Sequence, residues 1–163
     1  MRIRFAGGGD FDDVLAIYNA AIPGRDATAD LVAVSPAQRS AWFHQRDPAR
    51  RPLWVLEQDG EVRGWLALDD FSSRAGYHPT VEVAVYVAPG HQGHGYGRAL
   101  LEHGLAACPS LGIDRVVAKV FTHNASSVAL FRRAGFGEWG LLPGVTIMDG
   151  VRRDVLVLGL ALT

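Results

Sequence analysis

The sequence has one cysteine and one lysine among 163 residues, and it has no long apolar run. Its longest strongly apolar stretch, Val155–Leu162, is far shorter than the roughly 20 residues of a membrane-spanning helix. Met1–Gly7 lacks the apolar segment of roughly 7–15 residues that a secretory signal needs. Cys108 cannot form an internal disulfide, and we expect it to be a small buried thiol. These absences predict a cytoplasmic protein that does not enter a membrane.

Neither sign of charge is in excess. Sixteen basic residues against 17 acidic ones give a net charge of -1, which argues against a large surface for nucleic acid or for an anionic membrane. No His, Cys or Asp residues have the spacing of metal ligands, so we predict no metal site. The hydrophobic fraction of 48% and the charged fraction of 20% are near globular averages. With no repeat or linker evident, we predict a single domain over residues 1–163.

The apolar pattern and the turn signals predict an α/β domain. Asp10 precedes an amphipathic helix that reaches Ile22, and Ser35 with Gln38 forms a capping box for a second helix to about Gln45. Asp59-Gly60 is a hairpin signal between two antiparallel strands. Further helices are predicted at Gly97–Ala107 and from Asn124 to Gly135, and strands at Arg2–Phe5, Leu53–Gln58, Val62–Asp69, Thr80–Val87, Arg115–Phe121, Phe136–Leu142 and Val151–Leu162.

A glycine-rich turn follows the strand Thr80–Val87 and leads directly into a helix. This layout points backbone N–H groups at a phosphate, with help from the helix dipole. A Walker loop would need a lysine and a hydroxyl where Arg98-Ala99 stands, and a dinucleotide fingerprint would need a glycine at Arg98. Neither fits, and what remains is Gln-x-x-Gly-x-Gly at Gln92, Gly95 and Gly97. A glycine-rich turn without a ligand is the structural alternative.

This pattern resembles the pyrophosphate loop of the GNAT superfamily of acyl-CoA N-acetyltransferases. A second segment, Asn124–Phe136, is similar to the superfamily's Asn-x-x-Ser-x-x-Leu-(Tyr/His/Phe)-x-x-x-Gly-Phe segment. The likeness to the phosphinothricin and methionine-sulfone N-acetyltransferase branch is carried by Ile17–Ile22, Trp42-Phe43, Asp59–Trp65, Arg74–Tyr77, Thr80–Val87 and Gly150-x-x-x-Asp154. It covers nearly the whole chain and implies a mixed, mostly antiparallel sheet flanked by helices.

The resemblance implies that acetyl-CoA is the cosubstrate and that no metal takes part. Its thioester arm is expected along the β-strand backbone, its pyrophosphate over the glycine-rich turn, and its remainder against the second segment. The cofactor-binding residues implied in this way are Val85, Tyr86, Val87, Gln92, Gly93, His94, Gly95, Tyr96, Gly97, Arg98, Asn124, Ser127 and Phe131. A backbone N–H near Tyr86 or Val87 is expected to stabilise the oxyanion.

Glu82 shares a strand face with Ala84 and Tyr86, opposite the valines, which are expected in the core. It matches the family's glutamate that deprotonates the amine, directly or through water, whereas an ordinary surface carboxylate is the alternative. Arg74 is the candidate for binding a substrate carboxylate, and Tyr77 the candidate for lining the pocket. The expected acceptor is a small amino-acid-like primary amine.

Two positions depart from the family pattern. Phe131 stands where His or Tyr is common, so no acid is available there for the leaving thiolate, and Arg152 stands where the branch commonly has Trp. The second departure favours methionine-derived sulfones or sulfoximines over phosphinothricin as acceptors. A catalytically silent acyl-CoA-binding module and an acetyltransferase acting on a protein or peptide amine remain alternatives. The resemblance also implies a homodimer.

Overall fold

The computed structural model describes residues 1–163 as one seven-stranded sheet with helices on both faces. The strand order is β1-β2-β3-β4-β5-β7-β6, and every neighbouring pair is antiparallel except β4 and β5. This confirms the predicted mixed sheet. The strands are β1 (Arg2–Phe5), β2 (Leu53–Gln58), β3 (Glu61–Asp70), β4 (Thr80–Val87), β5 (Arg115–Phe121), β6 (Gly137–Met148) and β7 (Val151–Ala161).

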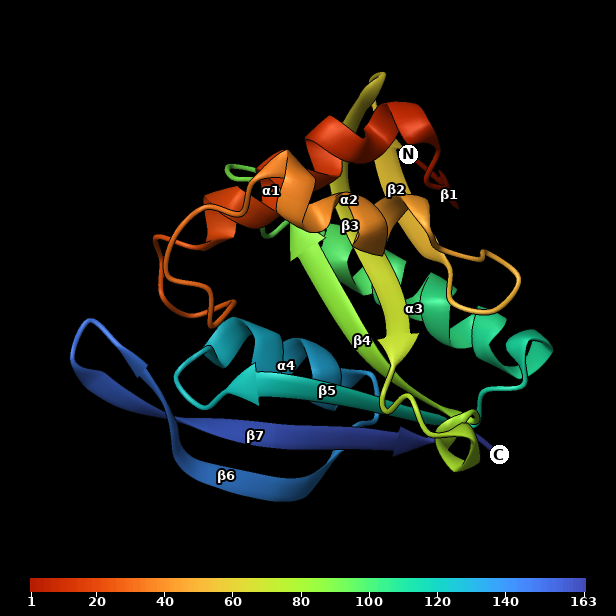
Figure 1. Cartoon of the computed structure of the whole chain (residues 1–163). Helices are drawn as coiled ribbons and strands as arrows, with labels where there is room; N and C mark the ends of the chain where they lie inside the picture. The colour runs from red at the N-terminus through yellow and green to blue at the C-terminus, as the bar shows by residue number, and fades with distance from the viewer.

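The predicted capping box and hairpin turn are present at the expected residues. Helices α1 (Phe11–Ala21) and α2 (Pro36–His44) pack on one face, and α3 (Tyr96–Ala107) and α4 (Ala125–Arg133) pack on the other (Figure 1). Ser35 accepts the Gln38 N–H, and the Gln38 side chain accepts the Ser35 N–H, so the capping box is complete. Asp59 and Gly60 both have positive φ, as a tight hairpin turn of β2 and β3 requires.

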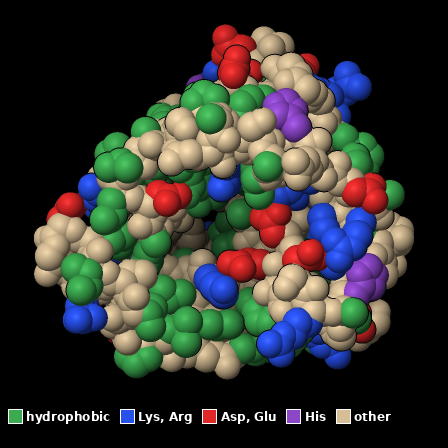
Figure 2. All heavy atoms as spheres, viewed as in Figure 1, with side chains coloured by type: hydrophobic (Ala, Val, Ile, Leu, Met, Phe, Trp, Pro, Cys, Tyr) green, Lys and Arg blue, Asp and Glu red, His purple; other side chains and the backbone are tan.

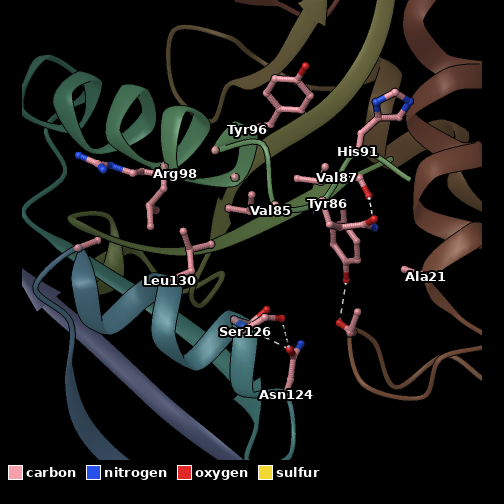
Figure 3. Close-up of a pocket in the computed structure, with 18 of the residues that line it drawn as sticks. Ala21, Val85, Tyr86, Val87, His91, Tyr96, Arg98, Asn124, Ser126 and Leu130 are labelled. Carbon is pink, nitrogen blue, oxygen red and sulfur yellow. Dashed lines mark hydrogen bonds between the residues drawn. The ribbon is translucent and has the colours of Figure 1, made fainter. Parts of the chain in front are cut away.

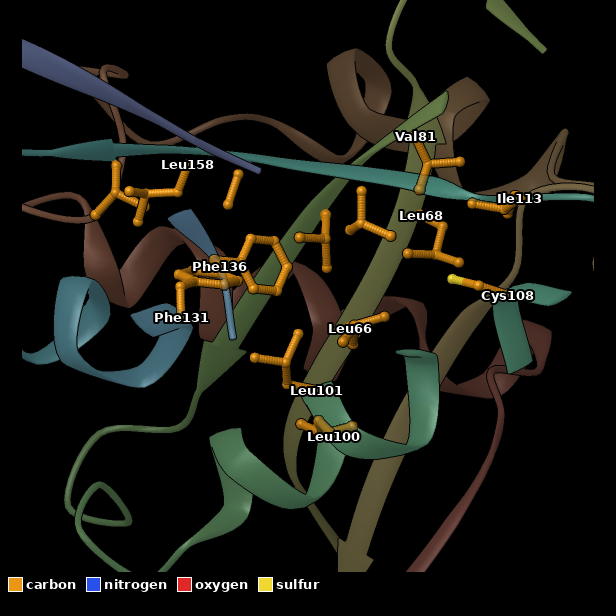
Figure 4. Packing of buried hydrophobic residues seen from close by; sticks show 14 of the residues in the cluster. Leu66, Leu68, Val81, Leu100, Leu101, Cys108, Ile113, Phe131, Phe136 and Leu158 are labelled. Atoms are coloured by element: carbon orange, nitrogen blue, oxygen red, sulfur yellow. The ribbon is translucent and has the colours of Figure 1, made fainter. Parts of the chain in front are cut away.

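Two apolar clusters hold these layers together. The larger lies under α3 and α4 and includes Leu66, Val81, Leu100, Phe131 and Leu158 (Figure 4). The smaller lies under α1 and α2, where Trp65 is fully buried and its indole N–H donates to the Val14 carbonyl. Each face of the sheet therefore has its own core.

The single parallel pairing opens the sheet. Strands β4 and β5 are paired only from Thr80 with Arg115 to Glu82 with Val117, although both strands continue beyond that point. Figure 1 shows the two strands diverging from their shared end near the C-terminus. The rest of β4 consequently lacks a neighbour on that side.

Two sequence predictions need correction. Val81 and Val83 are buried in the larger cluster, but Val85 is only half-buried, and it lines a cleft together with Val87, because β5 has moved away there. Strand β6 continues past Leu142 to Met148, because a register shift between Leu142 and Thr146 accommodates the proline and glycine between them. Proline is tolerated at such irregularities on an edge strand.

Candidate active site

A cleft of about 1110 Å³ occupies the space where β4 and β5 diverge. Figure 3 shows it between α3, α4 and β4, with the end of α1 on one side. Of the residues predicted to bind a cofactor, the cleft is lined by Val85, Tyr86, Val87, Gln92, Gly93, Gly95, Tyr96, Gly97, Arg98, Asn124 and Ser127. Residues from β4 and the adjacent glycine-rich turn therefore form one surface with residues of α4, which lies well beyond them in the sequence.

The glycine-rich turn presents free backbone donors to this cleft. The Ala99 N–H bonds to the Gly95 carbonyl, so the preceding N–H groups at the start of α3 have no partner within the helix. Gly93 and Gly95 have φ values of 79°, and a Cβ on either would enter open space. Gln92 braces the turn by donating to the Val87 carbonyl and accepting the Gly90 N–H. An anionic group such as a pyrophosphate fits this cradle.

Tyr86 contributes its backbone and a fixed ring to the site. Its ring stacks on Trp65, and its hydroxyl donates to the Ala27 carbonyl at 3.1 Å. Burial, followed by the nearby Tyr18, raises the pKa of the Tyr86 hydroxyl well above its ordinary value, so this group stays protonated. The side chain therefore serves as a structural anchor.

The beginning of α4 closes the opposite wall. Asn124 caps the helix by accepting the Ser127 N–H at 3.2 Å, and its amide donates to the Asp26 carbonyl at 2.9 Å. The Nε2 atom of His123 lies 2.8 Å from the Arg25 carbonyl oxygen. Together with Tyr86, these contacts attach the loop between α1 and α2 to the rim of the cleft.

Glu82 is not among the residues that line the cleft. It lies on β4, three residues before Val85, on the face of the strand that looks toward α1 and α2. Its carboxylate is 3.5 Å from the Nζ atom of Lys119 on β5, and the two side chains are 34% and 44% exposed, respectively. Across the sheet, Glu82 is in register with Asp69, whose carboxylate pairs with Arg46. Figure 2 shows a hollow in this face, with acidic and basic side chains around it. Glu82 is thus accessible to a ligand.

The two predicted acceptor-binding residues lie on the loop between β3 and β4. Arg74 is exposed, and it donates a hydrogen bond to Ser72 through its backbone N–H. Tyr77 packs on Phe71, and the Phe71 ring lies 5.9 Å from the Lys119 ammonium. The loop thereby connects Tyr77 with the neighbourhood of Glu82, whereas the Arg74 side chain forms no hydrogen bond or ion pair with Glu82 or Lys119.

Two other predicted residues lie outside the lining of the cleft. Phe131 is 5% exposed and packs on Phe136 in the core, and His94 stacks on Tyr96 at the exposed turn. Two cations near the site were not predicted from the sequence. Arg133 lines the cleft in addition to Arg98, and Lys119 lies next to Glu82 on β5. The place of Arg133 in the cleft could have been inferred from its position in the α4 segment. The place of Lys119 next to Glu82 depends on the parallel pairing of β4 and β5, which the sequence does not show.

The structure brings together no group of three or more histidine, cysteine or carboxylate side chains that could bind a metal ion. None of its helices has both the length and the apolarity that a membrane crossing demands. The lysine, arginine and carboxylate side chains that line the cleft itself are Asp26, Arg98, Glu102 and Arg133.

Comparisons with known proteins agree on one family. The family model for acetyltransferases (GNAT) matches residues 12–136. The chain is 41% identical over 160 residues to YwnH of Bacillus subtilis, named provisionally as a phosphinothricin acetyltransferase, and the match covers 98% of each chain. It is 34% identical over 162 residues to an L-methionine sulfoximine/L-methionine sulfone acetyltransferase of Salmonella typhimurium, covering 99% of this chain and 95% of the relative.

A solved structure repeats the fold. The structure of yncA from Salmonella typhimurium with its cofactor acetyl-CoA has a TM-score of 0.94 and 34% sequence identity. The superposition covers 100% of this chain and 94% of that one. The likeness therefore extends over the whole chain, including the cleft.

Proposed function

The chain belongs to the GNAT family of acetyltransferases, and we propose that it transfers the acetyl group of acetyl-CoA to the primary amine of a small amino-acid-like acceptor, with Glu82 as general base. The observation that carries the proposal is the position of Glu82. It is an accessible carboxylate on β4, the strand whose unpaired end lines the cleft.

The cleft suits the cosubstrate in shape and in charge. The free N–H groups at the start of α3, together with Arg133 and with Arg98, whose present partner is the exposed Glu102, match a pyrophosphate and a phosphorylated ribose. The unpaired edge of β4 at Val85–Val87 offers backbone groups to an extended amide-containing arm. The acetyl thioester would then lie beside Tyr86, within the split of the sheet.

The reaction requires a neutral amine, yet an α-amino group with a pKa of about 7.7–8.0 is largely protonated at neutral pH. The Glu82 carboxylate accepts a proton from the ammonium group, directly or through a water molecule. The freed nitrogen attacks the thioester carbonyl carbon, so that a C–N bond forms and the C–S bond breaks with its electron pair going to sulfur. The nitrogen loses its second proton to a water molecule as the amide forms, and water delivers a proton to the thiolate, so that CoA leaves as the thiol. Glu82 releases the first proton to solvent.

The leaving group needs little assistance. A thiol has a pKa of about 8.5, so its thiolate is a stable leaving group. A proton from water is therefore enough to neutralise it. This is consistent with an apolar side chain at Phe131, which is buried away from the cleft. A backbone N–H near Tyr86 or Val87 is the proposed donor to the developing oxyanion.

The acceptor class is supported by the relatives and by the charges near Glu82. The Salmonella relative is named for methionine sulfoximine and methionine sulfone, which carry a carboxylate beside the amine. Two cations are candidates for binding that carboxylate: Arg74, which was predicted from the sequence, and Lys119, which the structure adds. Arg152 donates to the Gly144 carbonyl at 3.0 Å in the hairpin of β6 and β7. Because Arg152 stands where the branch commonly has Trp, we propose that sulfones and sulfoximines are better acceptors than phosphinothricin.

Replacing Glu82 tests the proposed function. We expect Glu82→Gln to lower kcat by roughly 10²–10⁴-fold at pH 7, with a smaller loss at alkaline pH, where the free amine is already abundant. Thiol release from acetyl-CoA is measured with methionine sulfone, methionine sulfoximine, phosphinothricin and a short peptide. Calorimetry should show unchanged acetyl-CoA affinity, and Glu138→Gln, at an exposed carboxylate, serves as the control. Near-parent activity of Glu82→Gln, or a preference for the peptide, would contradict the proposal.

We also propose a cytoplasmic homodimer. Apolar side chains are exposed on the long hairpin of β6 and β7, among them Trp139, Leu141, Val145 and Ile147, which are 49 to 55% exposed. Exposed apolar surfaces of this kind favour association with another protein surface. Sedimentation equilibrium should give twice the chain mass, and Ile147→Lys should shift the protein toward monomer. A parent protein that sediments as a monomer would overturn the dimer.

A further inference from the structure

Lys119 is the single lysine of the chain. Its position next to Glu82, where the acceptor is proposed to bind, was not predicted from the sequence. It lies on β5, two residues beyond Val117, the residue in parallel register with Glu82. Side chains two residues apart on a strand share a face, so Lys119 and Glu82 project from neighbouring strands into the same space. Their closest charged atoms are 3.5 Å apart.

This ion pair is open to a ligand. Both side chains are about one third or more exposed, and exposed pairs of this kind contribute little to folding stability. A separation of 3.5 Å is also longer than the usual N–H···O range of about 2.7–3.2 Å. A ligand that bears both charges can therefore replace the pair at small cost.

No neighbouring charged side chain competes for Glu82 or Lys119. Asp69, the cross-strand neighbour of Glu82, is bound by Arg46 and receives the Trp42 indole N–H. On its other side, Lys119 faces the Phe71 ring, which carries no charge. Glu82 and Lys119 therefore each form an ion pair only with the other, whereas Asp69 is already paired with Arg46.

We propose that Lys119 binds the carboxylate of the acceptor while Glu82 binds the amine bonded to the same carbon. This inference rests on the proposed function and names the group that selects the acceptor. In an α-amino acid the ammonium and carboxylate groups are close together. The ammonium would meet the Glu82 carboxylate, and the carboxylate would meet the Lys119 ammonium, so that each charge faces its opposite. A decarboxylated amine satisfies only Glu82 and leaves Lys119 unmatched. The exposed Arg74 forms no side-chain hydrogen bond or ion pair with either residue.

The test compares each amino acid with the amine obtained by removing its carboxylate, for example methionine sulfone with 3-(methylsulfonyl)propylamine. We expect the parent enzyme to prefer the carboxylated acceptor, and Lys119→Met to reduce that preference by about 10- to 100-fold through KM, with kcat changing much less. Lys119→Arg should restore most of the preference, because it retains the positive charge. Arg115→Met removes a cation from the same strand and should leave the preference unchanged.

The single lysine permits a second readout that does not depend on turnover. An amine-reactive acylating reagent labels only Lys119 and the terminal amine of Met1, so mass spectrometry can follow both in one sample. With CoA present, methionine sulfone should protect Lys119 from the reagent, whereas the decarboxylated amine should not. The Met1 amine should react equally in both samples.

The outcomes distinguish a failure of the carboxylate site from a failure of the proposed function. If no amino acid is acetylated, both the proposed function and the inference that rests on it are wrong. If amino acids are acetylated but Lys119→Met keeps the parent preference, only the inference fails. A loss of preference in Arg74→Ala, with none in Lys119→Met, would assign the carboxylate to Arg74.

Discussion

At the scale of single residues, the glycine-rich turn depends on backbone conformations that other residues rarely adopt. Gly93 and Gly95 have positive φ, and a Cβ on either would have no neighbour within 4 Å, because the space beside them is the cleft. An L-residue with positive φ is disfavoured by about 1–2 kcal/mol. Any added side chain would also occupy the volume that the pyrophosphate needs.

We therefore expect Gly95→Val to lose acetyl-CoA binding as well as some stability. Gly60→Val is the matched control, because Gly60 has nearly the same φ and open surroundings but lies in the β2–β3 hairpin, away from the cleft. Urea unfolding should show that both variants lose about 1–2 kcal/mol of stability. Calorimetry should show at least a hundredfold weaker acetyl-CoA binding only for Gly95→Val, a loss of about 2.7 kcal/mol in binding free energy. Equal affinities would place the coenzyme elsewhere.

At the scale of elements, local sequence signals predicted most boundaries of helices and strands. The features that these signals did not predict depend on pairing between distant strands. The capping box at Ser35 and the turn at Asp59-Gly60 act through neighbouring residues, so the sequence alone predicted them. The glycine-rich turn was predictable for the same local reason. The ion pair of Glu82 with Lys119 joins residues 37 positions apart and depends on the parallel register of β4 and β5, which no local pattern encodes.

The cap of α4 links element stability to the cleft. Asn124→Ala removes the hydrogen bond from the Ser127 N–H and the contact with the Asp26 carbonyl, so we expect a loss of about 1 kcal/mol and a several-fold higher KM for acetyl-CoA. Ser35→Ala removes an equivalent cap from α2 and should cost similar stability. Its KM for acetyl-CoA should stay at the parent value. Steady-state kinetics and urea unfolding separate the two effects, and equal KM values would show that the loop does not depend on Asn124.

At the scale of the whole molecule, the sheet consists of two parts joined by a short parallel pairing. One part, β1 to β4, carries α1 and α2, and the other, β5 to β7, is paired with it over three residue pairs. The larger core cluster spans both parts and supports α3 and α4. A ligand held between α3, α4 and β4 therefore contacts both parts at once, and it should bind the folded chain but not the unfolded one.

This arrangement predicts that acetyl-CoA stabilises the protein against heat. A ligand specific for the folded state contributes about 2.7 kcal/mol at a concentration 100 times its Kd, and each kcal/mol raises the Tm of a domain of this size by about 2–4 °C. Scanning calorimetry with saturating acetyl-CoA should thus show a Tm increase of about 5–10 °C. ATP, a nucleotide of comparable charge without the thioester arm, should give a much smaller increase, because it cannot occupy the unpaired edge of β4. Gly95→Val should lose the increase with acetyl-CoA, and an equal increase with both ligands would indicate a general anion site in place of a coenzyme site.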